Sequence, residues 1–133
     1  MARVLVVDDN PAGRELLAVV LRGAGHEVLL ASDGDEGLQV YRTHRPELVI
    51  LDVFMPRKDG IETIRELRRE PGPVKIIATS AGWNVRNLDI VGSAADWDVL
   101  RHAKEVGADV TMTKPIDVDA LVQKVAGLLA SRP

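Results

Sequence analysis

The sequence contains no cysteine, few aromatic residues, no long apolar run and only a small excess of negative charge. The absence of cysteine excludes disulfides, thiol catalysis and thiolate metal sites. No apolar run reaches transmembrane length and the N-terminus lacks the pattern of a signal peptide, so we expect a cytoplasmic protein without a membrane partner. The net charge of −3 argues against nucleic acid as a direct partner.

Apolar residues nevertheless make up 46% of the 133 positions, and they are mainly aliphatic because aromatic residues account for only 3%. A chain of this length and composition can bury a substantial core and fits one domain. No linker, internal repeat or low-complexity tract divides it. We therefore expect a single domain over residues 1–133.

Short apolar runs alternate with longer amphipathic segments along the chain. The runs, which predict strands, are residues 4–7, 28–31, 48–51, 74–78 and 110–113. Three of them are apolar without alternation, which is typical of parallel strands covered on both faces. Helical patterns lie between them and after the last, with predicted N-caps at Asn10, Ser93 and Asp117. This repeat predicts an α/β fold, a (βα)5 doubly wound parallel sheet.

Polar residues follow four of the five predicted strands. They are Asp8 and Asp9 after the first, Asp52 after the third, Thr79 and Ser80 after the fourth, and Lys114 after the fifth. The carboxyl ends of parallel strands form one edge of the sheet, so these side chains should converge there. Lys114 alone does not balance three carboxylates, whereas a divalent cation does, and oxygen-only ligands favour Mg²⁺.

The same set of residues suits phosphoryl transfer to an aspartate. A carboxylate serves as the nucleophile, a metal ion and Lys114 neutralise the transferring oxygens, and Ser80 hydrogen-bonds one of them. The chemistry needs residues that are far apart in the sequence, and the predicted sheet brings them together.

Four segments in this order, "VLVVDDNP", "LVILDVFMPRKDG", "IIATSA" and "MTKPI", resemble the receiver domain of two-component response regulators. The resemblance covers essentially the whole chain and implies a flavodoxin-like sheet with strand order 2-1-3-4-5. It implies a phospho-accepting signalling switch rather than a turnover enzyme. The implied partners are a histidine kinase or histidine phosphotransfer protein and an output protein or fused domain, and we expect a monomer or weak dimer.

The resemblance also assigns roles to individual residues. Asp52 would accept the phosphoryl group, Lys114 would pair with it, and Ser80 would hydrogen-bond it and act as the switch. Ser80 is favoured over Thr79 because Ala81 follows it, as in the family pattern. The implied Mg²⁺ ligands are Asp8, Asp9, Asp52 and the backbone carbonyl of Phe54, the first of these acting mainly through a bound water.

Several further positions have a role that the resemblance implies or depart from the family pattern. Pro115 would form a cis peptide bond that aims the lysine before it. Phe54 and Gly82 occupy positions that tune dephosphorylation in the family, and the bulk of Phe54 predicts a long-lived phosphoryl group. Thr111 replaces the usual aromatic switch residue, and residues 81–93 form an unusually long predicted loop.

Two alternative functions remain open from the sequence. A haloacid-dehalogenase-like phosphatase shares the aspartate, hydroxyl, lysine and Mg²⁺, but it usually has an acid where this chain has Phe54, and its nucleophile follows the first strand. A pseudo-receiver would bind partners without being phosphorylated, although every chemical position is filled here.

Overall fold

The apolar runs of the sequence form the strands, and a helix follows each strand. The computed structural model describes residues 2–53, 60–80 and 94–130, with only the backbone of residues 94–99. The strands are β1 (Arg3–Val7), β2 (Glu27–Ala31), β3 (Leu48–Asp52), β4 (Lys75–Ser80) and β5 (Val110–Thr113). The helices are α1 (Pro11–Gly23), α2 (Gly34–His44), α3 (Gly60–Arg69), α4 (Ala94–Val106) and α5 (Val118–Ala130). The expectations for Phe54, Gly82, Ser93 and the loop 81–93 lie outside the described residues.

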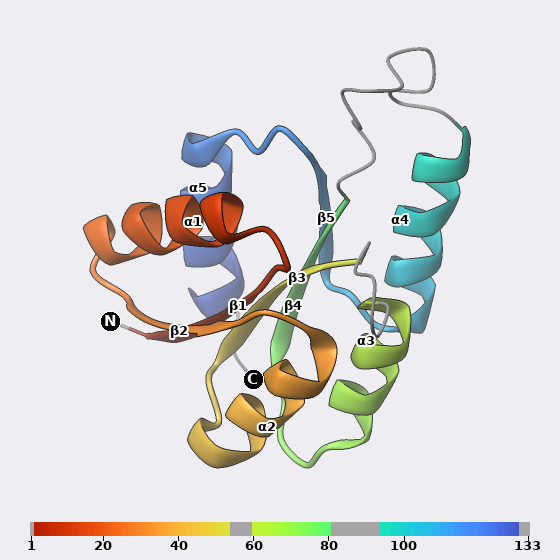
Figure 1. Ribbon diagram of the computed structural model, residues 1–133, viewed down its shortest axis with the longest axis horizontal. Helices are drawn as coiled ribbons and strands as arrows, with labels where there is room; N and C mark the ends of the chain where they lie inside the picture. Colours follow the sequence, from red (N-terminus) through yellow and green to blue (C-terminus); the bar gives the residue numbers. More distant parts are fainter. Residues whose placement is uncertain (1, 54–59, 81–93, 131–133) are drawn as a thin grey trace.

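The strands form one parallel sheet in the order β2-β1-β3-β4-β5, which confirms the predicted order (Figure 1). Two strands extend further at their carboxyl ends than their apolar runs predict. β3 ends at Asp52 rather than at residue 51, and β4 ends at Ser80 rather than at residue 78. The reason is that the ladder continues, with Asp52 paired to Thr79 and Ser80 paired to Thr113.

Side-chain caps fix the start of two helices where the sequence predicts them. The Asn10 side chain accepts hydrogen bonds from the backbone N–H groups of Ala12 and Gly13, directly before Pro11 at the first position of α1. Asp117 Oδ1 accepts from Ala120 N at 3.1 Å at the start of α5. These caps confirm two of the predicted helix starts.

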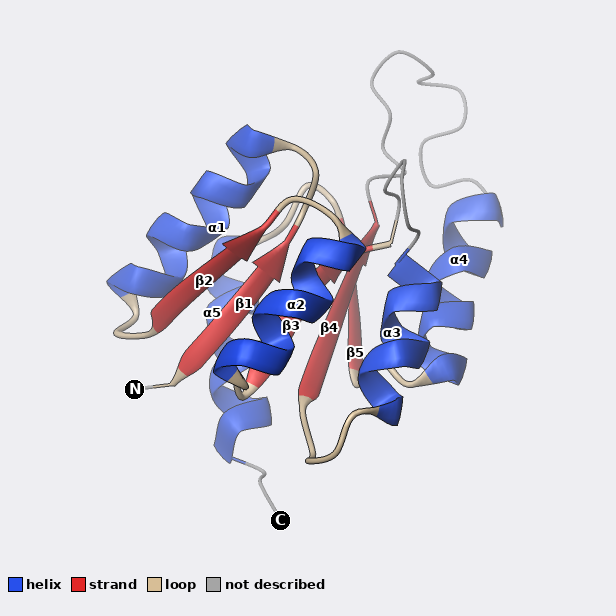
Figure 2. Cartoon of the chain, turned by 60° about the horizontal axis from the view of Figure 1, so that its bottom comes forward, coloured by secondary structure: helices blue, strands red, loops and turns tan. Residues whose placement is uncertain are grey.

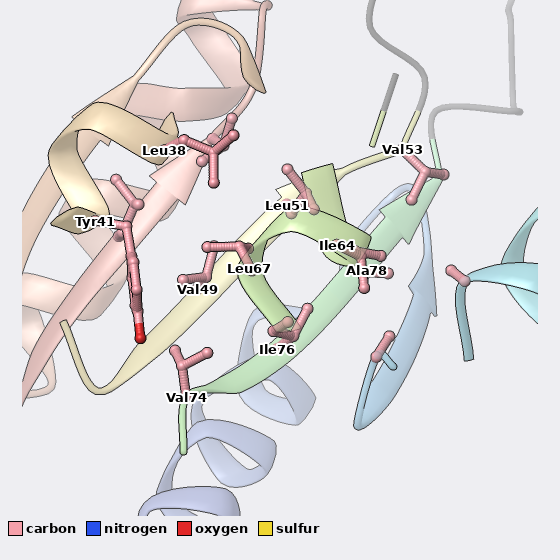
Figure 3. Close-up of a cluster of buried hydrophobic side chains, with 14 of the residues drawn as sticks. Leu38, Tyr41, Val49, Leu51, Val53, Ile64, Leu67, Val74, Ile76 and Ala78 are labelled. Carbon is pink, nitrogen blue, oxygen red and sulfur yellow. The ribbon is translucent and has the colours of Figure 1, made fainter. Parts of the chain in front are cut away.

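The sheet is covered on both faces, as its apolar strands require. Figure 2 shows α1 and α5 on one face, with α2, α3 and α4 on the other. Figure 3 shows the second face, where side chains of α2 and α3 pack onto β3 and β4; the labelled residues include Leu38, Tyr41, Val49, Leu51, Ile64, Leu67, Ile76 and Ala78. Covered strands leave their carboxyl ends as the place where polar side chains gather.

Among the helices described, none is both long and apolar enough to span a membrane.

Candidate functional site

Three carboxylates meet at the carboxyl end of the sheet. Asp8 and Asp9 follow β1, and Asp52 is the last residue of the neighbouring β3. Each of the three offers an oxygen atom within 4.8 Å of those of the other two. Asp8 and Asp52 are each only 2% exposed, whereas Asp9 is exposed to solvent. We call this group of three residues the acidic site.

The alternation of side chains along each strand explains why these groups face one another. The residues two positions before Asp8, Asp52 and Lys114 are Val6, Ile50 and Met112, and all three pack in the core cluster beneath α1 and α5. Because side chains repeat with a period of two, the polar residues project toward the same side of the sheet. The alternation of apolar residues along the strands therefore determines the side of the sheet on which the polar side chains lie.

Backbone hydrogen bonds between neighbouring strands hold the ends in place. They run from Asp8 N to Ala31 O at 3.1 Å, from Val53 N to Thr79 O at 2.9 Å, and from Lys114 N to Ser80 O at 3.1 Å. In each of these strands the backbone pairing therefore extends to the end of the strand, next to the site residue. This pairing limits the movement of the backbone that carries the polar side chains.

Lys114 lies beside the acidic site and forms ion pairs with two of its carboxylates. Its Nζ donates to Asp8 Oδ2 at 2.9 Å and to Asp52 Oδ2 at 3.3 Å, so it links the residue that follows β5 to the carboxyl ends of β1 and β3. Burial lowers the pKa of Lys114, but the Asp52 charge and the hydrogen bond to Asp8 outweigh it and raise the pKa above its ordinary value of 10.5. The Lys114–Pro115 peptide bond is cis, as the resemblance implied.

Both carboxylate oxygens of Asp8 accept hydrogen bonds from protein groups. Its Oδ1 accepts from Asn10 N at 2.9 Å, while its Oδ2 accepts from Lys114. Its main-chain carbonyl accepts from Arg14 Nη1 at 2.7 Å. Nothing local in the sequence marks Arg14 as part of the site, since an arginine in the second turn of a helix is an ordinary surface residue.

The two candidate hydroxyls, Thr79 and Ser80, are both buried at the end of β4. Thr79 pairs with Asp52 in the sheet register, and Ser80 pairs with Thr113. Alternation places their side chains on opposite faces of the strand. Only one of the two hydroxyls therefore lies on a given face of the strand. Replacing each of them in turn tests which one belongs to the site.

Thr111 lies in β5 opposite Ala78 and is half-buried. It lines a recess of about 410 Å³ together with residues of α4 and α5, among them Leu100 and Lys124. The position where the family pattern has an aromatic side chain thus borders a hollow on this face.

The donor set of the acidic site fits a hard divalent cation. It consists of carboxylate oxygens only, and three carboxylates share a single ammonium within the described residues. Oxygen ligands at this density match Mg²⁺, which binds through one or two carboxylates and keeps several waters.

Comparisons with known proteins agree with this geometry. Residues 4–126 match the response regulator receiver domain family. The chain is 36% identical over 127 residues to the DNA-binding response regulator MtrA of Mycolicibacterium smegmatis, covering 96% of this chain and 50% of MtrA. It is 32% identical over 134 residues to protein PilH of Pseudomonas aeruginosa, covering 98% of this chain and 99% of PilH.

The fold has matching solved structures as well. The crystal structure of the receiver domain of NtrX from Brucella abortus superimposes with a TM-score of 0.82 at 27% identity, over 97% of this chain and 99% of that one. The chain spans about half the length of several of its relatives, MtrA among them. A family match over most of the chain, with the same fold and an acidic site at the ends of β1 and β3, shows that the chain belongs to the response regulator receiver domains of two-component systems.

Proposed function

We propose that this chain is a cytoplasmic phospho-accepting switch. It takes a phosphoryl group from the phosphohistidine of a histidine kinase or histidine phosphotransfer protein onto Asp52, and this changes its affinity for an output partner. The observation that carries the proposal is the Asp52 carboxylate itself, which is buried between the Lys114 ammonium and two further carboxylates in a receiver fold. We take residues 1–133 as a single receiver domain that acts as a monomer or weak dimer.

In the proposed transfer an Asp52 oxygen attacks phosphorus. A P–O bond forms while the P–N bond to the donor imidazole breaks, and the imidazole nitrogen keeps the bonding electron pair. The Lys114 ammonium lies 3.3 Å from Asp52 Oδ2, so it is in place to pair with phosphoryl oxygens held on that carboxylate. We assign Ser80 as the hydroxyl that hydrogen-bonds the phosphoryl group because Ala81 follows it, as in the family pattern; Thr79, which pairs with Asp52 in the sheet, is the competing candidate.

We propose Mg²⁺ as the cofactor. Asp9 and Asp52 would hold it directly with the carbonyl of Phe54, which lies outside the described residues. Asp8 would act through a bound water, because both of its carboxylate oxygens already accept hydrogen bonds from Asn10 N and Lys114. When bound, the ion supplies positive charge to the oxygens of the transferring group.

An apolar recess beside the acidic site supports a protein as the phosphoryl donor. The recess has a volume of about 310 Å³, lies between α1 and residues 114–116, and includes Asp8 and Lys114 in its lining. Leu16 in its wall is 53% exposed, and Val19 on the same helix is 59% exposed. Large exposed apolar side chains on the helix that borders the acidic site favour a docking surface for the donor.

For the output we propose a partner protein or a fused domain outside this chain. Thr111 in place of the aromatic residue of the family pattern means that the response on the α4, β5 and α5 side does not use rotation of that side chain. We assign no enzyme activity beyond phosphorylation and dephosphorylation of Asp52 itself.

The test is intact-mass measurement after incubation with Mg²⁺ and acetyl phosphate. Wild type should gain one phosphoryl group, Asp52→Asn should gain none, and the exposed-residue control Asp119→Asn should behave as wild type. Rapid consumption of acetyl phosphate without an adduct would indicate the phosphatase alternative. No adduct and no consumption would indicate a pseudo-receiver, and either result would contradict the proposal.

A further inference from the structure

Arg14 makes a contact that the proposed transfer does not use. Its Nη1 donates to the main-chain carbonyl of Asp8 at 2.7 Å, from the second turn of α1 back to the end of β1. A guanidinium donor makes this a charge-assisted hydrogen bond, which is stronger than one between neutral groups. Arg14 itself is half-buried. The bond therefore fixes the peptide unit that joins Asp8 to Asp9.

Further hydrogen bonds connect residues within the segment from Asp8 to Arg14. Asp8 Oδ1 accepts from Asn10 N at 2.9 Å, and Asn10 O accepts from Arg14 N at 2.9 Å. The Asn10 side chain in turn caps α1. Asp9 lies within the segment that these hydrogen bonds hold. The bonds therefore set the direction in which the Asp9 side chain projects from the backbone.

Asp9 is the member of the acidic site that most needs such support. It is exposed, while its carboxylate lies close to those of Asp8 and Asp52. Like charges at this distance repel, and an exposed side chain relieves the repulsion by turning toward solvent. A fixed backbone on both sides of Asp9 keeps its Cα–Cβ bond directed toward the site, so fewer side-chain rotamers lead away from Asp52.

We propose that Arg14 is a positioning residue for the Mg²⁺ site, which holds the Asp8–Asp9 peptide so that the Asp9 carboxylate faces Asp52. The inference rests on the Mg²⁺ binding proposed above and adds a residue to it. Arg14 touches neither the ion nor the phosphoryl group in this role.

The direction in which Mg²⁺ affinity changes when Arg14 is replaced distinguishes a positioning role from an effect of its charge. A positive charge near a cation site weakens cation binding, so a role of Arg14 through its charge alone predicts tighter Mg²⁺ binding when the charge is removed. A positioning role predicts weaker binding, because partners that orient metal ligands are typically worth about tenfold or more in affinity.

The experiment is a Mg²⁺ titration by isothermal calorimetry without any phosphoryl donor, with melting temperatures of the metal-free proteins measured alongside. Arg14→Met should bind Mg²⁺ about tenfold more weakly than wild type. Arg14→Lys, which keeps one charged donor, should recover part of the loss. Arg22→Met removes the same charge from an exposed position in the last turn of α1 and is the matched control, with affinity unchanged or slightly higher.

Equal or tighter Mg²⁺ binding by Arg14→Met than by Arg22→Met overturns the inference. So does a loss of affinity that Arg14→Lys does not recover at all while its metal-free melting temperature equals that of wild type. If wild type itself binds no Mg²⁺, both the cofactor assignment and this inference fail. If wild type binds Mg²⁺ and is phosphorylated on Asp52 while Arg14→Met binds as tightly, only this inference fails.

Discussion

Replacing Lys114 by methionine should change stability and Mg²⁺ affinity in opposite directions. The substitution keeps the unbranched apolar part of the side chain but removes the ammonium that contacts Asp8 at 2.9 Å and Asp52 at 3.3 Å. Both carboxylates are buried, and together with Asp9 they then form a cluster of negative charge that lacks its ammonium. Mg²⁺ would no longer have to compete with an ammonium for the same oxygens.

The size of the stability loss follows from these distances. At an effective dielectric constant of about 20, charges this far apart attract by about 5–6 kcal/mol per pair. Desolvation offsets much of this gain, but removing one partner of a buried ion pair still costs about 3–5 kcal/mol because the other charge stays buried. For a chain of this size we expect a fall in melting temperature of about 10–20 °C in the absence of metal.

Thermal unfolding of the metal-free and Mg²⁺-loaded proteins measures both effects. Mg²⁺ should raise the melting temperature of Lys114→Met by more than that of wild type, since each tenfold gain in affinity adds about 1.4 kcal/mol at saturating metal. Lys124→Met, at an exposed position of α5, is the control for loss of a lysine. Equal melting temperatures for the two metal-free variants would refute the ion-pair geometry, and equal Mg²⁺ effects would refute the competition.

The pH dependence of the metal-free protein gives a second measure of the same ion pairs. Folding raises the pKa of Lys114 above 10.5, so the stabilisation is fully present below pH 10.5 and is lost as pH rises through the folded-state pKa. The gap in melting temperature between wild type and Lys114→Met should therefore stay constant up to pH 10.5 and narrow above it. A gap that narrows on acidification from neutral pH toward pH 6 would contradict this assignment.

Three further changes test other parts of the site. Ser80→Ala should slow phosphorylation by acetyl phosphate about 10-fold or more, as loss of a transition-state donor does, while Thr79→Ala should not; the opposite ranking would move the hydroxyl role to Thr79. Gly60→Ala should destabilise the protein by about 1–3 kcal/mol in chemical denaturation, because a Cβ there would lie 2.4 Å from Val53 Cα, and unchanged stability would mean that α3 shifts freely. Leu16→Asp should impair transfer from a phosphorylated histidine phosphotransfer protein but leave acetyl phosphate labelling intact, and equal loss with both donors would place the defect in Asp52 chemistry instead of docking.

Local sequence patterns were enough to predict the elements of this fold. Apolar runs located the strands because a parallel strand covered on both faces needs apolar side chains at nearly every position. Asn10 and Asp117 marked helix starts because their short side chains satisfy backbone N–H groups that the helix leaves unpaired. The position of Asp8, Asp9, Asp52 and Lys114 directly after or at the end of these runs was sufficient to predict one shared edge.

The tertiary structure decided the contacts within that edge. Whether Lys114 reaches Asp8 as well as Asp52 depends on strand order and on side-chain direction, which no local pattern encodes. Asp52 and Thr79 each lie one residue past the end of their apolar run, and their pairing depends on register across the sheet. The bond from Arg14 to the Asp8 carbonyl depends on how α1 packs back against β1. The sequence by itself determined which chemical groups collect at the end of the sheet, and the packed fold determined which of them touch.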